Sequence, residues 1–282
     1  MALNKQIVFI GAGNMAEAMI SGMVTTGTVE PGQITVTNRS NGERLAELNE
    51  RYGVRGVPRH MVNLGEADVV IIAMKPKDAE KCLLSLKDEL HADQVLMSVL
   101  AGITTSFMEE HLQTGQQVIR VMPNTSSMIQ ESATAISPGE NVTMKNIKLA
   151  KTLLQAIGEV YVIEEDQMDL FTGIAGSGPA FYYYLTEHIE KAAEENGMDP
   201  ANAREIAAQT LLGAAKMMME RDESPAQLRK NITSKNGTTA AGLTELAENG
   251  GGRAIRAAIE GAMNRSKEIS SQLEKKKEPV HQ

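Results

Sequence analysis

The sequence predicts a chain of two domains, with an α/β N-terminal domain over residues 1–164 and an all-α C-terminal domain over residues 165–273. Two observations carry this prediction. Short apolar runs typical of buried parallel strands recur as far as Val162, and glycine, proline or polar residues follow them. After Glu164 no β-rich run appears, and helix start and stop signals take over. At 282 residues the chain is long for one core, which agrees with two domains.

The glycine-rich turn near the N-terminus predicts a nucleotide-binding loop. Apolar residues 7–10 run into the sequence Gly-Ala-Gly-Asn-Met-Ala at 11–16, and apolar side chains then recur at helical spacing. Gly11 can take a turn conformation closed to other residues, Gly13 lets a pyrophosphate approach the backbone, and Ala16 lets the helix pack on the strand. The helix N-terminus offers free N–H groups to a phosphate. The pattern favours a Rossmann-type dinucleotide site over an ordinary glycine-rich turn.

The second strand, expected at 34–38, ends in a stretch that bears on cofactor choice. An NAD site usually has a carboxylate here for the ribose 2′-hydroxyl, whereas an arginine and small hydroxyls suit the 2′-phosphate of NADP. Asn38, Arg39 and Ser40 therefore favour NADP(H). The alternative makes Ser40 the N-cap of a helix that ends at Gly53, and Arg39 a solvated charge.

The remaining strands of the α/β domain lead to a lysine at a strand end. We expect strands at 54–57, 69–73, 95–99, 118–122, 132–136 and 159–162, with a helical turn near Asn63 and a helix over 145–157. Lys75 follows the buried strand at 69–73, on the rim where open α/β sheets bind ligands, and Pro76 restricts it to an extended conformation. A solvated loop lysine is an equally good interpretation from position alone.

Helical signals dominate the C-terminal part. Asn196-Gly197 indicates a helix end, Asp199-Pro200 and Ser224-Pro225 indicate helix starts, and Gly250–Gly252 indicates a break. The stretch 176–179, Gly-Ser-Gly-Pro, predicts a helix interrupted by proline. About a hundred residues with so many alanine pairs would form a thin core, so we expect this domain to interlock with a second copy of the chain.

The segment 231–243 stands out as non-helical at its centre. Asn236-Gly237 is a turn signal, residues 240–246 are typical of a helix, and Thr238 or Thr239 can cap that helix. One interpretation is a second anion site, in which the backbone N–H groups of residues 237–239 bind a carboxylate. The other is a plain connection with a capping threonine, and the residues alone slightly favour it.

Composition excludes several function classes. The formal net charge of −8 argues against nucleic acid as a general partner. Cys82 is the single cysteine, so no intrachain disulfide forms, and the five histidines show no metal-ligand spacing. No apolar run approaches a membrane span and the first strand begins close to Met1, so we expect no signal peptide and a cytoplasmic protein with no membrane partner. We expect residues 274–282 to form a disordered tail.

Five motifs in order resemble one enzyme family. They are the glycine loop with Asn-Met-Ala, Met-Lys-Pro at 74–76, Arg-Val-Met-Pro-Asn-Thr at 120–125, Gly-Ser-Gly-Pro-Ala at 176–180, and Thr-Ser-x-x-Gly-Thr-Thr-x-x-Gly-Leu at 233–243. Over about residues 6–272 the chain looks like a pyrroline-5-carboxylate reductase. The resemblance implies reduction of 1-pyrroline-5-carboxylate to L-proline, the last step of proline biosynthesis, with NADP(H) and also NAD(H) as cofactors. It also implies a helical C-terminal dimerisation domain in a homodimer, often assembled further into decamers.

The resemblance assigns roles to individual residues. The cofactor-binding residues it implies are Gly11, Ala12, Gly13, Asn14, Met15, Ala16, Asn38, Arg39, Ser40, Asn63, Ala73, Met74, Lys75, Pro76, Ala101 and Gly102. The substrate-binding residues are Asn231, Ser234, Gly237, Thr238 and Thr239, and the catalytic ones are Thr239 and Lys75. Two positions depart from the family pattern. The chain has Ser-Lys-Asn-Gly at 234–237 where the family usually has Ser-Pro-Gly-Gly, and Ser126 where it has proline.

The implied reaction asks little of acid–base groups. A bound iminium accepts hydride at carbon and loses its charge, so catalysis rests on position, with Thr239 hydrogen-bonding the ring nitrogen and N–H groups anchoring the carboxylate. Lys75 would orient either cofactor or substrate. Two alternatives stay open: a β-hydroxyacid dehydrogenase-like reductase, which needs a general-acid lysine earlier than Lys191, and a non-enzymatic NADP-binding regulatory paralogue, which the altered 234–236 loop would suit.

Overall fold

The computed structural model describes residues 2–275 and divides them into two compact units. The first unit consists of residues 2–177 and 261–275, and the second of residues 178–260. The tail expected at 274–282 lies outside the described residues from 276 onward.

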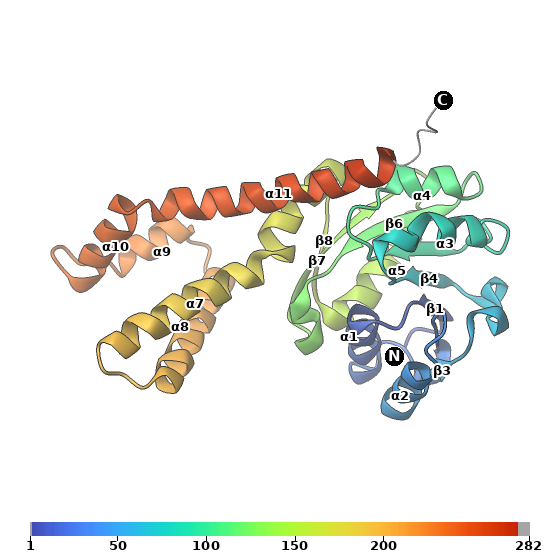
Figure 1. Ribbon diagram of the computed structural model, residues 1–282, viewed down its shortest axis with the longest axis horizontal. Coiled ribbons are helices and arrows are strands. Elements are labelled where there is room, and N and C mark those ends of the chain that lie inside the picture. The colour runs from blue at the N-terminus through green and yellow to red at the C-terminus, as the bar shows by residue number, and fades with distance from the viewer. Residues whose placement is uncertain (1, 276–282) are drawn as a thin grey trace. The chain divides into compact units, whose positions relative to one another are not determined.

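The first unit is an eight-stranded sheet with helices on both faces (Figure 1). The strand order is β3-β2-β1-β4-β5-β6-β7-β8, and every neighbouring pair is parallel except β6 and β7. The elements are β1 (Ile7–Ile10), α1 (Asn14–Thr25), β2 (Ile34–Thr37), α2 (Gly42–Tyr52), β3 (Arg55–Gly56), β4 (Val69–Ile72), α3 (Ala79–Leu86), β5 (Val95–Ser98), α4 (Thr105–His111), β6 (Gln117–Met122), β7 (Ser132–Pro138), α5 (Met144–Leu154), β8 (Gly158–Val162) and α6 (Met168–Phe171).

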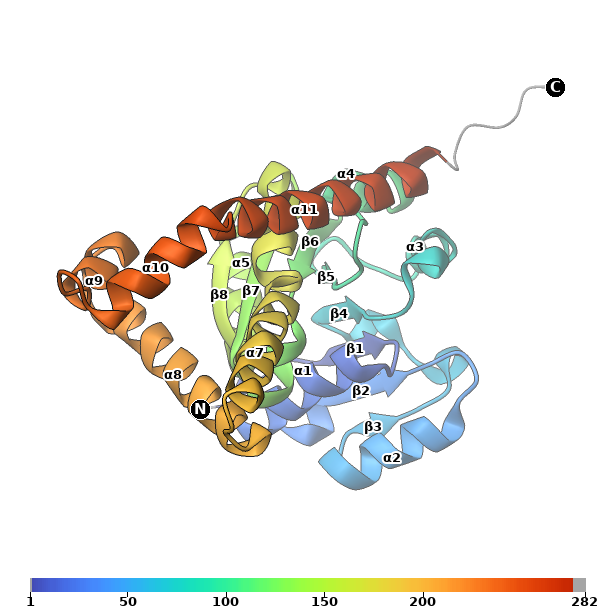
Figure 2. The same cartoon turned by 60° about the vertical axis from the view of Figure 1, so that its left-hand side comes forward.

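Alternating residues of the central strands belong to two separate cores. Ile7 and Phe9 of β1 pack with α1, α2 and α5, whereas Val8 and Ile10 pack in a second cluster with α3 and α4. Figure 2 shows these helices distributed over the sheet. Because both faces are covered, a central strand such as β4, Val69–Ile72, is apolar at every position. The fold class predicted from the sequence is confirmed for this unit.

Several local expectations need correction. The N-cap of α2 is Asn41 and not Ser40, since the Asn41 side chain accepts a 3.0 Å hydrogen bond from the Arg44 N–H. Gly53 does end α2, with φ +72°. The strand expected at 54–57 is reduced to the two residues of β3, and helices α3 and α4 had no sequence prediction. The helix expected at 145–157 is α5 followed by a 3₁₀ turn over Gln155–Ile157.

An ion pair joins the buried Arg120 of β6 to the turn before α6, and Asp169 of α6 connects this site to the C-terminal helix. Arg120 is only 2% exposed, and its Nη1 donates a 2.6 Å hydrogen bond to Glu165. Asp169 of α6 lies 3.9 Å from Arg120 Nη2 and accepts a 2.7 Å hydrogen bond from Ser266. The motif arginine at position 120 is therefore part of the interior of the first unit.

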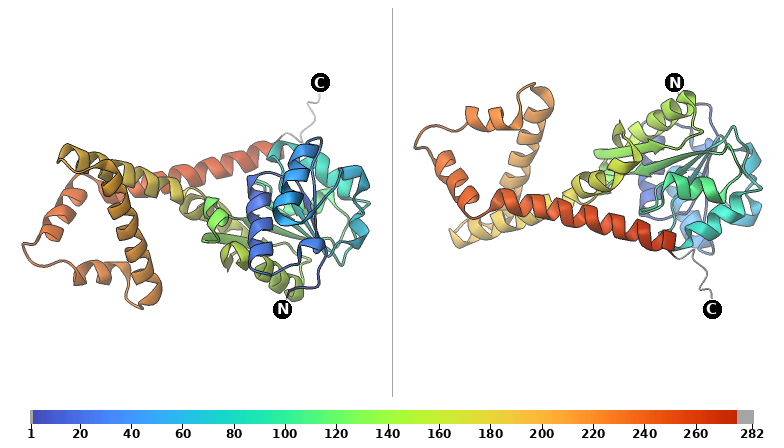
Figure 3. Two further views of the ribbon diagram at one scale, coloured as in Figure 1. Left: turned by 90° about the horizontal axis from the view of Figure 1, so that it is seen from below. Right: turned by 90° about the horizontal axis from the view of Figure 1, so that it is seen from above.

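The second unit is entirely helical in its regular structure (Figure 3). It contains α7 (Gly178–Glu195), α8 (Pro200–Glu220), α9 (Pro225–Asn231), α10 (Thr238–Glu248) and the beginning of α11 (Gly251–Lys275). Asp199 and Ser224 cap α8 and α9 as expected, and Gly197 and Gly250 take positive φ values of 84° and 78° at helix ends. The all-α prediction is confirmed by these elements.

The interruption expected at 176–179 takes the form of a widened helical turn. Residues Thr172–Gly176 form a π-helical turn, closed by a 2.8 Å hydrogen bond from the Ser177 N–H to the Thr172 carbonyl. Pro179 is the second residue of α7, and the carbonyl of Ala175, four residues before it, accepts a 3.0 Å hydrogen bond from the Asn124 amide in place of the N–H that proline lacks. The irregularity is therefore a widened turn that directly precedes the start of α7.

The second unit leaves much apolar surface uncovered. Its buried hydrophobic residues are Ala203 and Ala207, whereas Tyr183, Tyr184 and Met219 are 68%, 61% and 77% exposed. This agrees with the thin core expected from the sequence. Among residues 2–275, none of the helices combines the length and apolar character that crossing a membrane requires. In the same range no group of His, Cys, Asp and Glu side chains is arranged to hold a metal ion.

Candidate functional site

The loop between β1 and α1 has the shape of a phosphate cradle. Gly11 has φ +120°, and a Cβ there would lie 2.3 Å from the Ala73 carbonyl oxygen, so only glycine fits. A Cβ on the exposed Gly13 would meet nothing within 4 Å, and the N-terminus of α1 has no side-chain cap. Ala16, in the first turn of α1, is fully buried. Free N–H groups beside an open space fit a dinucleotide pyrophosphate.

Backbone hydrogen bonds bring the predicted cofactor residues to one edge of the sheet. The Gly11 N–H donates to the Thr37 carbonyl at 2.8 Å, and the Ala73 N–H donates to the Ile10 carbonyl at 2.9 Å. The N–H of Val99 continues the series to the carbonyl of Ile72 at 3.1 Å. The loops after β2, β1, β4 and β5 are therefore neighbours, in the order in which the strands pair. Open α/β sheets bind ligands at this carboxyl edge.

The loop after β2 holds its own shape through Asn38. The Asn38 amide donates to the Asn41 carbonyl at 2.7 Å, and its oxygen accepts from the Asn41 N–H at 2.9 Å. The amide nitrogen and the oxygen of the Asn38 side chain are therefore both hydrogen-bonded inside the loop. Arg39 and Ser40 are exposed, so their side chains are accessible to a ligand.

The other predicted cofactor residues differ in exposure and in whether their side chains already form hydrogen bonds. Lys75 has the extended backbone expected before proline, with φ −78° and ψ 136°, and its side chain is exposed. The Asn63 side chain accepts from the Gly65 N–H at 3.1 Å and donates to Glu66 at 2.9 Å. Gly102 is buried after β5 with φ +77°. Ala101 beside it is exposed.

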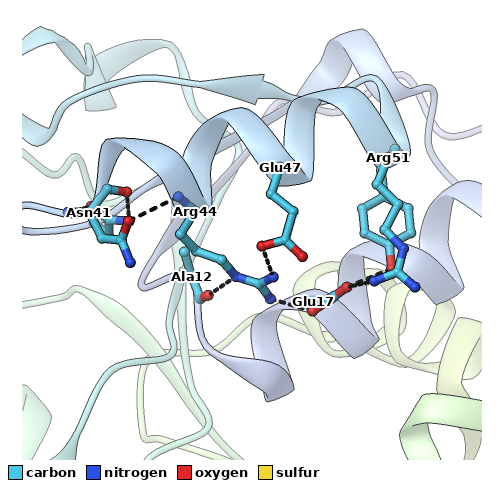
Figure 4. A network of polar contacts seen from close by, with 8 residues as sticks. Ala12, Glu17, Asn41, Arg44, Glu47 and Arg51 are labelled. Atoms are coloured by element: carbon cyan, nitrogen blue, oxygen red, sulfur yellow. Dashed lines mark hydrogen bonds and ion pairs between the residues drawn. The ribbon is translucent and has the colours of Figure 1, made fainter.

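An arginine that no sequence motif predicted contacts the glycine loop directly. The Nε of Arg44, in α2, donates a 3.0 Å hydrogen bond to the carbonyl oxygen of Ala12 (Figure 4). Its Nη1 pairs with Glu47 at 2.7 Å, and its Nη2 pairs with Glu17 of α1. In the sequence Arg44 resembles any charge on the solvent side of an amphipathic helix. The local pattern that involves Arg44 is its spacing of three residues to Glu47. That spacing predicts an ion pair on the surface of the helix and not a contact with the glycine loop.

Glu17 is the other centre of this network. It accepts hydrogen bonds from Arg51 at 2.7 Å and from the Tyr52 hydroxyl at 2.9 Å, besides its pairing with Arg44. Burial alone would raise the pKa of Glu17, but the hydrogen bonds from Arg44 and Tyr52 and the nearby positive charges more than offset it and lower that pKa. The carboxylate is therefore charged at neutral pH, in the first turn of the helix that would receive the phosphates.

The loop after β6 replaces the family proline with a hydrogen bond. The Ser126 N–H donates to the Asn124 side-chain oxygen at 2.9 Å, a bond that proline cannot make. The Asn124 amide also donates to the carbonyl of Ala175 at 3.0 Å, within the first unit. The departure at position 126 thus keeps the loop ordered by another means.

In the second unit the predicted substrate residues gather around a tight turn before α10. The Gly237 N–H donates to the Ser234 carbonyl at 3.1 Å. Asn236 has a positive φ of 60°, whereas φ of Lys235 is not positive. These features define a type II turn, which takes proline at its second position and glycine or asparagine at its third. The Lys-Asn sequence here fits the same turn as the Pro-Gly of the family.

The start of α10 differs from the expectation in two respects. Gly237 is the N-cap, so neither Thr238 nor Thr239 caps the helix, because both already lie in its first turn. The Gly237 N–H is used inside the turn, which leaves the N–H groups of Thr238, Thr239 and Ala240 as the donors of the helix start. Asn231, the last residue of α9, accepts a 2.6 Å hydrogen bond from Gln227.

Comparison with known proteins identifies relatives over almost the entire chain. A family model described as pyrroline-5-carboxylate reductase dimerisation matches residues 165–269, and one described as NADP oxidoreductase coenzyme F420-dependent matches residues 6–102. Pyrroline-5-carboxylate reductase 1 of Bacillus subtilis (strain 168) is 58% identical over 98% of this chain and 93% of its own length. The corresponding protein of Methanosarcina acetivorans is 38% identical over 97% of this chain and 99% of its own.

Solved structures agree with this assignment. A pyrroline-5-carboxylate reductase from Coxiella burnetii has a TM-score of 0.87 and 34% identity, covering 95% of this chain and 99% of that one. A Plasmodium falciparum pyrroline carboxylate reductase with NADP bound has a TM-score of 0.83 and 25% identity, covering 96% and 100%. With such identity over nearly its full length, the chain belongs to the pyrroline-5-carboxylate reductase family.

Proposed function

We propose that this chain reduces 1-pyrroline-5-carboxylate to L-proline with NAD(P)H, the final step of proline biosynthesis. The observation that carries the proposal is the 58% identity with a pyrroline-5-carboxylate reductase over 98% of the chain. The intact glycine loop and the preserved turn before α10 agree with it. That turn also removes the reason for considering a non-enzymatic paralogue, since Asn236 supplies the positive φ that the family obtains from glycine.

The cofactor is proposed to bind at the carboxyl edge of the sheet. The loop at 11–16 would hold the pyrophosphate, Arg39 and Ser40 the 2′-phosphate of NADP(H), and residues 73–76 and 101–102 the nicotinamide half, with Asn63 as a further contact. NAD(H) is the second cofactor in this proposal. When bound, the reduced nicotinamide supplies the hydride. The exposed Lys75 at the end of β4 would orient the bound molecules.

The substrate is proposed to bind at the start of α10. The N–H groups of Thr238 and Thr239 would hold its carboxylate, because a helix N-terminus favours an anion. The Thr239 hydroxyl would hydrogen-bond the ring nitrogen, and Asn231, Ser234 and Gly237 would shape the pocket. Hydride arrival at the iminium carbon removes a positive charge, so positioning groups suffice and no strong acid is needed.

Assembly and location complete the proposal. The helical domain, taken as residues 165–273 after an N-terminal domain of residues 1–164, is proposed to form a homodimer that assembles further into a decamer in the cytoplasm. The exposed tyrosines of α7 and the dimerisation model matching residues 165–269 support pairing through this domain. A single-chain mass in light scattering at micromolar concentration, with the helices still folded, would contradict the dimer.

The reaction is tested by following the oxidation of NADPH and of NADH by absorbance. We expect oxidation with 1-pyrroline-5-carboxylate, proline as the product, and no turnover with β-hydroxyacid-pathway substrates. Turnover restricted to the latter would assign the chain to another reductase of this architecture. Cofactor binding without turnover of any substrate would assign it to the non-enzymatic class.

A further inference from the structure

We infer that Arg44 is a positioning residue for the cofactor loop, because its guanidinium fixes the peptide between Ala12 and Gly13 and so directs the Gly13 N–H toward the bound phosphates. The inference rests on the proposed function only through the use of a nicotinamide dinucleotide. Neither residue of the ion pair between Arg44 and Glu17 was among the residues predicted to bind the cofactor.

The direction of the Gly13 N–H is set by the geometry of the peptide. Arg44 Nε donates to the Ala12 carbonyl oxygen at 3.0 Å. The described chain has no cis peptide bond, and in a trans peptide the carbonyl and the following N–H point in opposite directions. The Gly13 N–H therefore points away from Arg44. No acceptor among the described residues receives it, and the space beside Gly13 is open.

Without Arg44 this peptide would have little to hold it. A peptide flip changes ψ of Ala12 and φ of Gly13, and glycine accepts φ of either sign at almost no steric cost. A flipped peptide would present the Ala12 carbonyl oxygen to the phosphates, which repel it. The hydrogen bond from a charged donor is stronger than one between neutral groups and opposes the flip.

The same guanidinium balances a charge that would oppose the cofactor. Glu17 lies in the first turn of α1, close to where the phosphates would bind, and its pKa is lowered by its partners despite burial. The side chains of Arg44 and Glu17 are each only 18% exposed, so solvent screens this carboxylate weakly. Arg44 and Arg51 together offset its charge (Figure 4).

The chain offers a matched control for the test. Arg51 also pairs with Glu17, at 2.7 Å, but its side chain is 60% exposed, it lies over the Tyr52 ring, and within the described part of the chain its side chain donates a hydrogen bond to Glu17 and not to the glycine loop. NADPH binding to the full-length protein is measured by the fluorescence of the reduced nicotinamide. We expect Arg44→Met to weaken NADPH binding about tenfold and Arg51→Met to change it less than about twofold.

A second comparison separates positioning from simple loss of stability. We expect Arg44→Met to raise KM for NADPH while leaving KM for 1-pyrroline-5-carboxylate unchanged. Adding Glu17→Gln to Arg44→Met should recover part of the lost affinity, because the unbalanced carboxylate is removed. Arg44→Lys keeps the charge but cannot bond Ala12, Glu17 and Glu47 at once, so it should weaken binding about threefold, and it serves as the test should Arg44→Met not fold.

Unchanged NADPH affinity in Arg44→Met, or in Arg44→Lys if only that variant folds, would overturn the inference. Equal losses in the Arg44→Met and Arg51→Met variants would overturn it as well, since the contact with Ala12 would then contribute nothing. A wild-type protein that binds NADPH but does not oxidise it with 1-pyrroline-5-carboxylate would refute the proposed reaction. That outcome would leave the role of Arg44 in cofactor binding intact.

Discussion

The carbonyl oxygen of Ala73 lies 2.3 Å from the point that a Cβ on Gly11 would occupy. Backbone atoms of Ala73, directly after β4, cannot move aside cheaply, and φ of +120° is itself closed to alanine. We therefore expect Gly11→Ala to abolish NADPH binding in a fluorescence titration and to lower the thermal unfolding temperature. Gly27→Ala is the control, because Gly27 has φ +66° but no neighbour within 4 Å. It should lose about 1 kcal/mol of stability and keep its affinity.

Thr239 is the residue on which the proposed chemistry depends most. Thr239→Ala removes the hydroxyl proposed to hydrogen-bond the ring nitrogen, so we expect kcat with 1-pyrroline-5-carboxylate to fall about fivefold or more. Thr239→Ser should restore most of it. Thr244 lies on the same helix and its hydroxyl donates to the Ala240 carbonyl at 3.1 Å, so Thr244→Ala controls for the helix. Wild-type kinetics in Thr239→Ala, with an unchanged unfolding temperature, would refute the role of Thr239.

The turn before α10 makes a prediction about the two residues that depart from the family. Asn236 has φ +60°, which asparagine tolerates and alanine does not, so Asn236→Ala should destabilise the chain by about 1 kcal/mol and raise KM for the imine. Asn236→Gly should be neutral or stabilising, and Lys235→Pro should stabilise by about 0.5 kcal/mol. Urea unfolding and steady-state kinetics check all three. Equal effects of alanine and glycine at position 236 would contradict the turn assignment.

The ion pair between the buried Arg120 and the partly exposed Glu165 predicts a difference in stability effect between two glutamates. Arg120 is 2% exposed, so removing its 2.6 Å partner in Glu165→Ala leaves a buried charge with only the longer, 3.9 Å approach of Asp169 to balance it. We expect the free energy of unfolding to fall by roughly 2 kcal/mol. Glu268 pairs with Arg265 at a similar distance, but both side chains are 60% exposed, and Glu268→Ala should cost less than about 0.5 kcal/mol. If urea unfolding gave equal losses of unfolding free energy for Glu165→Ala and Glu268→Ala, the burial of Arg120 would not contribute to the effect.

Cys82 predicts a pH effect on stability. Burial raises the pKa of its thiol from 9.0 to about 11. Between these values the folded chain keeps the proton and the unfolded chain loses it, so stability should decrease as pH rises above 9, by up to about 1.4 kcal/mol per pH unit. Cys82→Ala should remove this part of the slope in urea unfolding. The thiol of the folded wild type should also react with a disulfide reagent far more slowly at pH 8 than in denaturant.

Local patterns made the strands and the glycine loop predictable, whereas side-chain contacts across the sequence were not. The strand before Gly11 and the apolar strand ending near Lys75 can each be predicted from a few consecutive residues. Arg44 meets Ala12 from 32 positions away, and no local pattern announces that contact. The antiparallel direction of β7 likewise depends on how the chain returns to the sheet and not on residues 132–138 themselves.

The predictions of the helix N-caps were wrong for a related reason. Serine and threonine are good caps by propensity, so Ser40, Thr238 and Thr239 were reasonable choices. The observed cap is the next residue, Asn41, for α2, and for α10 it is Gly237, one residue before Thr238 and two before Thr239, at the end of the turn. Shifts of one or two residues are usual at helix ends.

The two hydrogen bonds between Asn38 and Asn41 also bear on how this enzyme can evolve. The usual route from NADP(H) to NAD(H) places a carboxylate at the end of the second strand. At position 38 a carboxylate could accept from the Asn41 N–H but could not donate to the Asn41 carbonyl. The loop would therefore lose one of its two hydrogen bonds between positions 38 and 41. Selection for a different cofactor would therefore act on Arg39 and Ser40, whose exposed side chains make no hydrogen bond or ion pair with any residue in the range 2–275, and would leave position 38 unchanged.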